Sequence, residues 1–219
     1  MMNSLHRHRD AVLALIKQHH QPGQRLLIAI AGPPGSGKST LAESVVTALN
    51  ADANADHHAA LLPMDGFHLD TDMLVERGLV ARRGAPEIFD AAGFVKLIKA
   101  VRTSRDDIRY PVYDRSEERA IADAATLTAD TEIVVVEGNY LLLETSPWNQ
   151  LKIYFDAQVL LSCSLETLER RLMTRWLKFG YKPKEAVEKV AGNDLKNARL
   201  VIEHSTKADL TLSDEILVQ

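Results

Sequence analysis

The stretch GPPGSGKS, residues 32–39, decides the fold of this chain. It matches the pattern G-x-x-x-x-G-K-[ST], in which glycines let successive backbone N–H groups converge on anionic oxygens. The apolar run RLLIAIA comes before it, and a helical pattern with apolar Leu41, Val45 and Leu49 comes after it. Because strand, loop and helix follow in the order that the motif requires, the sequence predicts a polyphosphate site at a helix N-terminus.

The residues of this loop are the candidate nucleotide ligands. They are Gly32, Pro33, Pro34, Gly35, Ser36, Gly37, Lys38, Ser39 and Thr40. Lys38 is expected to reach the β- and γ-phosphates of ATP, and Ser39 to ligand Mg²⁺. The alternative, a glycine-rich turn that only caps a helix, leaves Lys38 unexplained.

Apolar runs elsewhere alternate between strand-like and helix-like patterns. Short runs at 26–31, 59–65, 133–138, 158–164 and 209–213 predict strands, and helical spacing at 4–19, 91–101, 165–179 and 183–190 predicts helices. This alternation favours an α/β fold of three layers with a mainly parallel sheet and ligands at the carboxyl ends of its strands. We expect one domain over residues 1–219, with an Arg- and Gly-rich segment inserted at about 71–111.

Composition limits the partners of the chain. Its 219 residues carry 26 basic and 30 acidic side chains and a net charge of −4, so neither nucleic acid nor an anionic membrane is an expected partner. The single cysteine cannot form an internal disulfide, and no N-terminal apolar run long enough for a signal peptide is present. These features favour the cytoplasm and leave open whether the chain forms a homodimer.

Asp65 is the candidate catalytic base. It closes the predicted strand 59–65 in the stretch MDGFHLD, at the carboxyl edge where the phosphate loop also lies. Phosphoryl transfer to an alcohol requires a carboxylate aimed at the acceptor hydroxyl. The alternative is an aspartate that only serves an Asp-Gly turn.

Five segments carry a resemblance to a known family: MDGFHLD, RRGAPEIFD, YPVYDRSEER, VVVEGNYLLL and RLMTRWLKFG. In this order they resemble the superfamily of uridine kinase, phosphoribulokinase and type I pantothenate kinase. The similarity is strongest to its bacterial branch of nucleoside or fructose transport-system kinases, and it spans roughly residues 25–215. It implies a P-loop NTPase fold with a small helical lid at about 170–185, and an ATP-dependent kinase that uses Mg²⁺.

The same resemblance assigns roles to single residues. It implies that Asp65 activates the acceptor hydroxyl, that Glu137 helps to hold Mg²⁺ or its waters, and that a lid arginine closes on the phosphates. Arg175 is the expected lid arginine, with Arg171 one helical turn earlier as the alternate. Other P-loop enzymes usually have aspartate where Glu137 stands, so Ser39 is the safer metal ligand. A solvated basic face is the alternative for the arginines.

The acceptor is expected to be a small polar alcohol. YPVYDRSEER places tyrosines and charged groups around Pro111, which predicts an irregular lining rather than a helix. The candidate acceptor-binding residues are Asp65, His68, Arg82, Tyr113, Arg115, Glu137 and Asn139. Asn193 and Asn197 either border the adenine, as the resemblance implies, or cap a helix end. Sugars, nucleosides and pantothenate-like alcohols all fit these features.

Two other functions fit parts of the sequence. A GTP switch would use DAAG (90–93) and TKAD (206–209), but DAAG begins an amphipathic pattern and TKAD runs straight into a predicted strand. An ATPase or nucleotide-sensing regulator would need neither a base at Asp65 nor the insertion at 71–111. The sequence therefore favours the kinase over both.

Overall fold

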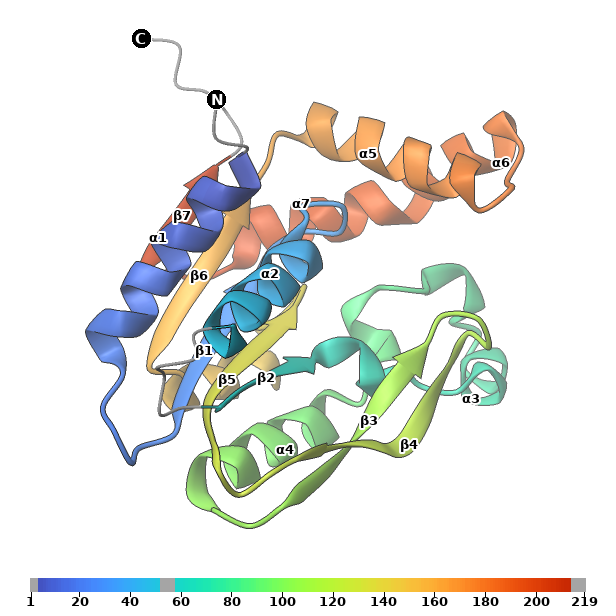
Figure 1. Ribbon diagram of the computed structural model, residues 1–219. Helices are drawn as coiled ribbons and strands as arrows, with labels where there is room; N and C mark the ends of the chain where they lie inside the picture. Colours follow the sequence, from blue (N-terminus) through green and yellow to red (C-terminus); the bar gives the residue numbers. More distant parts are fainter. Residues whose placement is uncertain (1–3, 52–57, 214–219) are drawn as a thin grey trace, which may run out of the picture.

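A five-stranded parallel sheet organises the molecule (Figure 1). The computed structural model describes residues 4–51 and 58–213. The strands are β1 (Leu26–Ala31), β2 (His58–Pro63), β5 (Thr131–Gly138), β6 (Ala157–Ser162) and β7 (Leu210–Ser213). They lie in the order β2-β5-β1-β6-β7, and every neighbouring pair is parallel. The predicted mainly parallel sheet is confirmed, and its apolar strand sequences reflect burial on both faces.

Helices cover both faces of the sheet. Side chains alternate along β1, so Leu26, Ile28 and Ile30 pack on one face, beneath α1 (Ser4–His19) and α2 (Lys38–Asn50). The opposite face of β1 packs against α4 (Ala91–Thr103), the 3₁₀ segment η4 (Trp148–Tyr154) and α7 (Leu195–His204). The result is the expected three-layer arrangement. No helix in the described ranges is long and apolar enough to cross a membrane.

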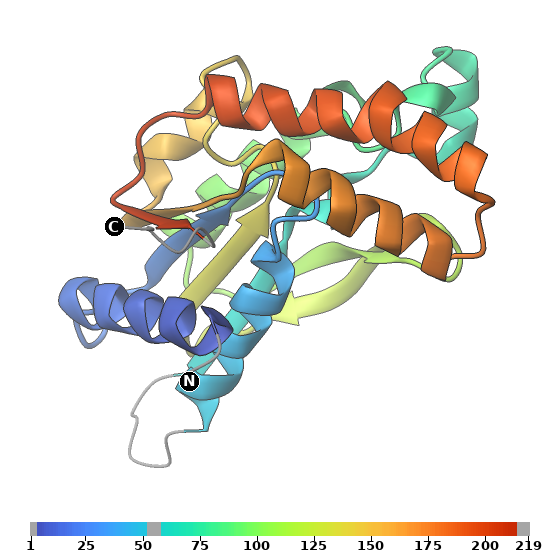
Figure 2. The same cartoon turned by 90° about the horizontal axis from the view of Figure 1, so that it is seen from above.

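A helical arm lies beyond one end of the sheet. It consists of α5 (Leu165–Lys178), α6 (Pro183–Lys189) and the π-helical turn η5 (Val190–Asp194), which leads into α7. Seen from above, α5 and α7 lie side by side (Figure 2). They share a small apolar core that includes Leu168, Leu172 and Ala198. The predicted helices at 165–179 and 183–190 are present, whereas α7 was missed because buried Asn197 interrupts its apolar stripe.

On the other side of the site, the chain forms short helices and a hairpin. The helices are α3 (Thr71–Glu76), η2 (Val80–Arg82) and η3 (Pro86–Ile88), and the hairpin pairs β3 (Ile108–Asp114) with β4 (Arg119–Leu127). The expected irregular backbone around Pro111 is wrong, because Pro111 lies inside β3. The register shifts between Tyr110 and Val112, so the missing N–H of Pro111 is tolerated at this irregularity.

Strand β2 is shorter than the sequence indicated. It ends at Pro63, and Met64–Phe67 form a 3₁₀ turn, η1, that carries Asp65. This turn packs tightly against two neighbours. A Cβ on Gly66 would lie 2.0 Å from the carbonyl oxygen of Pro111, and a Cβ on Gly138 would lie 2.6 Å from the Cβ of Met64. Both glycines therefore allow the close approach that positions Asp65.

Candidate functional site

The phosphate loop has the backbone shape that its glycines predict. Gly35 has φ 82° and Gly37 has φ 93°, a region that side chains with a Cβ rarely adopt. Gly37 is also the N-cap of α2, so the free N–H groups of the helix start face the loop. The arrangement is an anion-binding helix N-terminus.

Lys38, Ser39 and Glu137 form a polar cluster at the start of α2. Ser39 Oγ donates a hydrogen bond of 3.1 Å to Glu137 Oε2. Glu137, at the end of β5, is only 4% exposed, and burial raises the pKa of its carboxyl group while the Lys38 ammonium lowers it. Burial lowers the pKa of Lys38, whereas Glu137 and Asp65 raise it. Each charge therefore stabilises the other inside the protein.

Asp65 lies across the cavity from the loop, on η1. Its Oδ2 accepts a hydrogen bond of 3.2 Å from Arg115 Nη2, and both side chains are partly exposed, at 29% and 59%. Arg115 follows β3, so the hairpin holds the orientation of the Asp65 carboxylate. The backbone of Asp65 is fixed as well, because its carbonyl accepts a hydrogen bond of 2.7 Å from His68 Nδ1.

The close contact at Gly66 gives a first prediction. We expect Gly66→Ala to destabilise the protein by about 1–3 kcal/mol and to move η1, because the added Cβ cannot share space with the Pro111 carbonyl. Thermal unfolding and phosphotransfer rates of the variant would measure the two effects. Gly192→Ala, where an added Cβ meets nothing within 4 Å and φ, as at Gly66, is not positive, is the matched control. Equal losses in both variants would contradict the packing argument.

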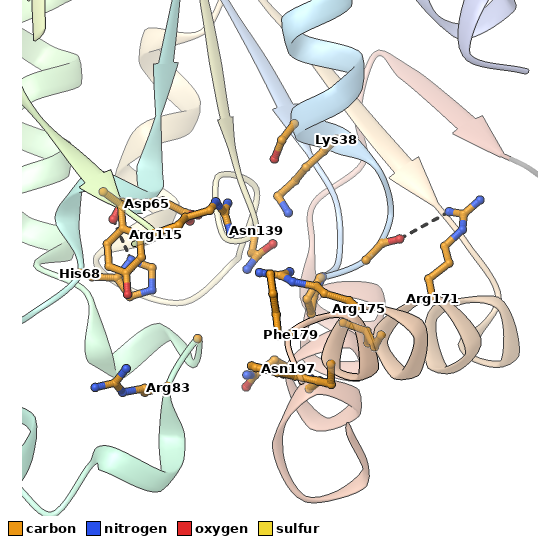
Figure 3. Close-up of a pocket in the computed structure, with 18 of the residues that line it drawn as sticks. Lys38, Asp65, His68, Arg83, Arg115, Asn139, Arg171, Arg175, Phe179 and Asn197 are labelled. Atoms are coloured by element: carbon orange, nitrogen blue, oxygen red, sulfur yellow. Dashed lines mark hydrogen bonds and ion pairs between the residues drawn. The ribbon is translucent and has the colours of Figure 1, made fainter. Parts of the chain in front are cut away.

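The phosphate loop and Asp65 face one cavity of about 720 Å³ (Figure 3). Most of the sequence-predicted residues line it: Pro34, Gly35, Gly37, Lys38, Ser39, Thr40, Asp65, His68, Tyr113, Arg115, Asn139, Arg171 and Arg175. Gly32, Pro33, Ser36, Arg82 and Glu137 do not appear in the lining, and Glu137 reaches the site through Ser39. The structure thus brings loop, aspartate and arm together around one space.

Of two neighbouring arginines, Arg83 lines the cavity and Arg82 does not. Arg82 is bound outside it, by an ion pair of 2.8 Å with Glu87 and a contact of 3.4 Å with Asn193. Arg83 donates a hydrogen bond of 2.6 Å to Glu118 at the turn of the hairpin. The sequence named Arg82 because it starts the family-like segment, and no local signal distinguishes the two.

The two arginines of α5 point in different directions. Figure 3 shows Arg175 extending into the centre of the cavity and Arg171 turned away from it. Arg171 donates to the carbonyl oxygens of Gly35 (3.5 Å) and Ser36 (3.2 Å), so it ties α5 to the phosphate loop. The guanidinium of Arg175 lies over the ring of Phe179, 5.7 Å from its centroid. Arg175 is therefore placed for a ligand, and Arg171 for the loop.

The arm contributes a wall of which the sequence named only Asn197, as a residue that borders the adenine or caps a helix end. Its residues are Trp176, Phe179, Tyr181, Asp194 and Asn197. Trp176 Nε1 donates a hydrogen bond of 2.6 Å to Asp194 Oδ2, and burial raises the pKa of Asp194. Asn193 donates to the carbonyl of Arg83, and Asn197 lies near Gly84. Both asparagines therefore meet the loop at residues 83–84. Asp194 lies in a π-helical turn, and such turns often occur at functional sites.

The motifs of a GTP switch have structural roles here. The side chain of Asp90 caps α4 by accepting a hydrogen bond from the N–H of Gly93, so DAAG is a helix start. Asp209 of TKAD accepts a hydrogen bond of 2.8 Å from the N–H of Gln158, which joins β6 to the start of β7. Neither motif faces the cavity.

Comparison with known proteins gives a consistent result. The model of the AAA domain family matches residues 28–194. The chain is 32% identical to "Putative uridine kinase C227.14" of Schizosaccharomyces pombe, covering 86% of this chain and 83% of that protein. It is 33% identical to a pantothenate kinase of Levilactobacillus brevis over 70% of its own length, and spans about half of that enzyme (53%).

A solved structure is similar over nearly the whole chain. The "putative fructose transport system kinase" from Silicibacter sp. TM1040 is 39% identical and superimposes with a TM-score of 0.86. The match covers 96% of this chain and 99% of that one. Fold and sequence therefore agree on the same group of proteins.

Proposed function

The chain belongs to the AAA domain family and to the P-loop small-molecule kinases of the uridine kinase and pantothenate kinase superfamily, and from that premise we propose that it transfers the γ-phosphate of MgATP to a hydroxyl of a small polar metabolite. The acceptor oxygen forms a bond to the γ-phosphorus as the bond from that phosphorus to the bridging oxygen breaks. ADP leaves with the electron pair, and the hydroxyl proton goes to the Asp65 carboxylate.

One observation carries this proposal: Asp65 and the phosphate loop face the same cavity from opposite sides. An alcohol bound between them has a proton acceptor on one side and the phosphate site on the other. Lys38 would neutralise phosphate charge, and Arg175 would add a second cation from the arm. A protein that only senses ATP has no need of a carboxylate placed opposite the phosphate loop; an ATPase could use one to activate water, and turnover with and without an alcohol separates that case.

The polar cluster beside the loop fits Mg²⁺. Hydroxyl and carboxylate oxygens are the ligands that this ion prefers, and Ser39 Oγ and Glu137 Oε2 already lie 3.1 Å apart. Ser39 would contact the ion directly, and Glu137 would hold it or one of its waters. When bound there, Mg²⁺ supplies positive charge to the phosphates. The positive charge of Lys38 stabilises the ionised carboxylate of Glu137, because it lowers the pKa of that group.

The contrast between the α5 arginines is a second prediction. We expect Arg175→Ala to lower kcat by about 10²–10³-fold, since it removes a cation at the transferring phosphate. Arg171→Ala is expected to raise the KM for ATP more than it lowers kcat, because the loop loses its tie to α5. Arg170, which is exposed on the same helix, gives the matched control: Arg170→Ala should leave both constants unchanged. Steady-state kinetics would measure all three, and equal effects at 171 and 175 would contradict these separate roles.

Turnover measurements separate the kinase from its alternative. With MgATP alone, we expect slow ADP release, and we expect faster release once a suitable alcohol is present, because closure around both substrates excludes water. Rapid ADP release that no alcohol accelerates would favour an ATPase. ATP should also outcompete GTP for binding, since the guanine-type motif TKAD lies outside the cavity.

A further inference from the structure

The half of the cavity around Asp65 has its cations already paired. Arg115 binds Asp65 at 3.2 Å, and Arg83 binds Glu118 at 2.6 Å. On the arm side of the same space, Asp194 and Arg175 carry opposite charges and interact with each other. An anionic group on the acceptor that binds either arginine would lie beside the carboxylate already paired with that arginine. Charge in this half of the cavity therefore disfavours an anion.

In contrast, two side-chain oxygens of the cavity wall have no hydrogen-bond donor among the described residues. Asn197 is only 2% exposed, lines the cavity, and its Oδ1 has no hydrogen-bond partner among the described residues. Asn139 Oδ1 is also buried, and it too has no hydrogen-bond partner within residues 4–51 and 58–213. Figure 3 shows Asn139 near the centre of the cavity and Asn197 farther down its wall, beside Phe179. Because buried oxygens without a donor are costly, each one calls for a donor from a ligand.

His68 adds a third acceptor. Its Nδ1–H donates to the carbonyl of Asp65, and burial lowers its pKa, so the ring is neutral and Nε2 carries a lone pair. The ring lies between those of Phe89 and Tyr113, with centroids 4.1 and 4.6 Å away, and this packing fixes its orientation. His68 therefore presents a fixed acceptor to the cavity that it lines.

We infer that the acceptor is an uncharged, hydroxyl-rich molecule, whose hydroxyl groups donate to the free oxygens of Asn139 and Asn197 and to Nε2 of His68. This inference rests on the proposed function and narrows it, because it excludes carboxylated and phosphorylated alcohols as preferred acceptors. Asn197 becomes a specificity-determining residue. The Nδ2 atom of Asn197 lies 3.7 Å from where a Cβ would stand on Gly84. The loop at residues 83–84 and α7 therefore together hold the amide in place.

Matched pairs of alcohols test the charge preference. The pairs are pantothenyl alcohol with pantothenate, and fructose with fructose 6-phosphate, each at saturating MgATP. We expect the neutral member of each pair to have the higher kcat/KM, by about tenfold or more. Faster transfer to the anionic members would overturn the inference and leave the proposed function standing. If ATP binds but no alcohol is phosphorylated, the proposed function fails, and the inference fails with it.

Substitutions at Asn197 test the amide directly. Asn197→Leu keeps the branched shape of the side chain, with a somewhat larger volume, but loses the free oxygen, so we expect a roughly tenfold higher KM for the neutral acceptor and an unchanged KM for ATP. Asn197→Asp keeps an oxygen acceptor and should recover part of the loss, which a merely structural role would not do. Lys196→Ala, at the exposed neighbouring position, is the control. An unchanged acceptor KM in Asn197→Leu, or equal rises for both substrates, would contradict the role of Asn197.

Discussion

Asp65→Asn should abolish most phosphotransfer, lowering kcat by about 10²–10⁴-fold while ATP still binds with the affinity of the parent protein. The amide keeps the size of the carboxylate and can keep a hydrogen bond from Arg115, but it cannot accept the hydroxyl proton. Steady-state kinetics with an acceptor that the parent protein phosphorylates, together with a calorimetric titration of ATP, would separate chemistry from binding.

Asp70 provides the control for that experiment. It is exposed, precedes α3, and makes no side-chain cap to that helix. Asp70→Asn should behave as the parent in both measurements. Equal transfer rates for Asp65→Asn and the parent would remove Asp65 from the role of base.

The second large effect is expected for Lys38→Met. We expect weaker ATP binding and a loss of about 10²–10³-fold in kcat, because one cation that faces the phosphate site is removed. The change also leaves the buried Glu137 without the ammonium group that lowers its pKa. Kinetics and ATP titration would measure the first effect. Lys17→Met on the exposed side of α1 should change neither quantity.

The pH dependence of stability reports on the same pair. Burial raises the folded-state pKa of Glu137, so the folded protein carries a cost once pH rises above the pKa of the unfolded carboxyl. Lys38 offsets this cost in the parent. The loss of Tm in Lys38→Met should therefore be small at acidic pH, where Glu137 is protonated, and should grow as the pH rises towards neutral. A loss of Tm that is independent of pH would contradict the pairing.

Local sequence predicts the conformation of the phosphate loop and of its flanking elements well. The spacing of Gly32, Gly37 and Lys38 between a buried strand and an amphipathic helix leaves few other conformations for the backbone. Strands β1 and β5 are continuous apolar runs bounded by turn residues, so their type and approximate ends follow from composition. Asp65 was located by the same logic, although the 3₁₀ turn that carries it was not foreseen.

The acceptor half depends on contacts between segments far apart in the chain. Arg83 lines the cavity and Arg82 does not because of their partners, Glu118 on the hairpin and Asn193 next to α7. Neither partner is visible from the sequence around residue 82. The hairpin itself was hidden by Pro111, which usually opposes strand pairing and is accommodated here where the register shifts.

Helical spacing alone also did not distinguish the roles of Arg171 and Arg175. One turn apart, they were expected on the same face of the helix, yet one binds the loop carbonyls and the other points into the cavity. The helix that carries Asn197, α7, was overlooked for a related reason. A polar residue on the inner stripe of α7 reduces the apolar periodicity, and the same polarity is what makes it available to a ligand.

The most direct test of the account is the fate of the γ-phosphate in a single turnover. Parent protein and Asp65→Asn would each be mixed with ATP labelled at the γ-position, Mg²⁺ and a neutral polyhydroxy acceptor, and the label would then be separated into acceptor phosphate and inorganic phosphate. The account predicts label in the acceptor for the parent and almost none for Asp65→Asn. Label that appears only as inorganic phosphate with every acceptor, or equal transfer by the two proteins, would contradict it.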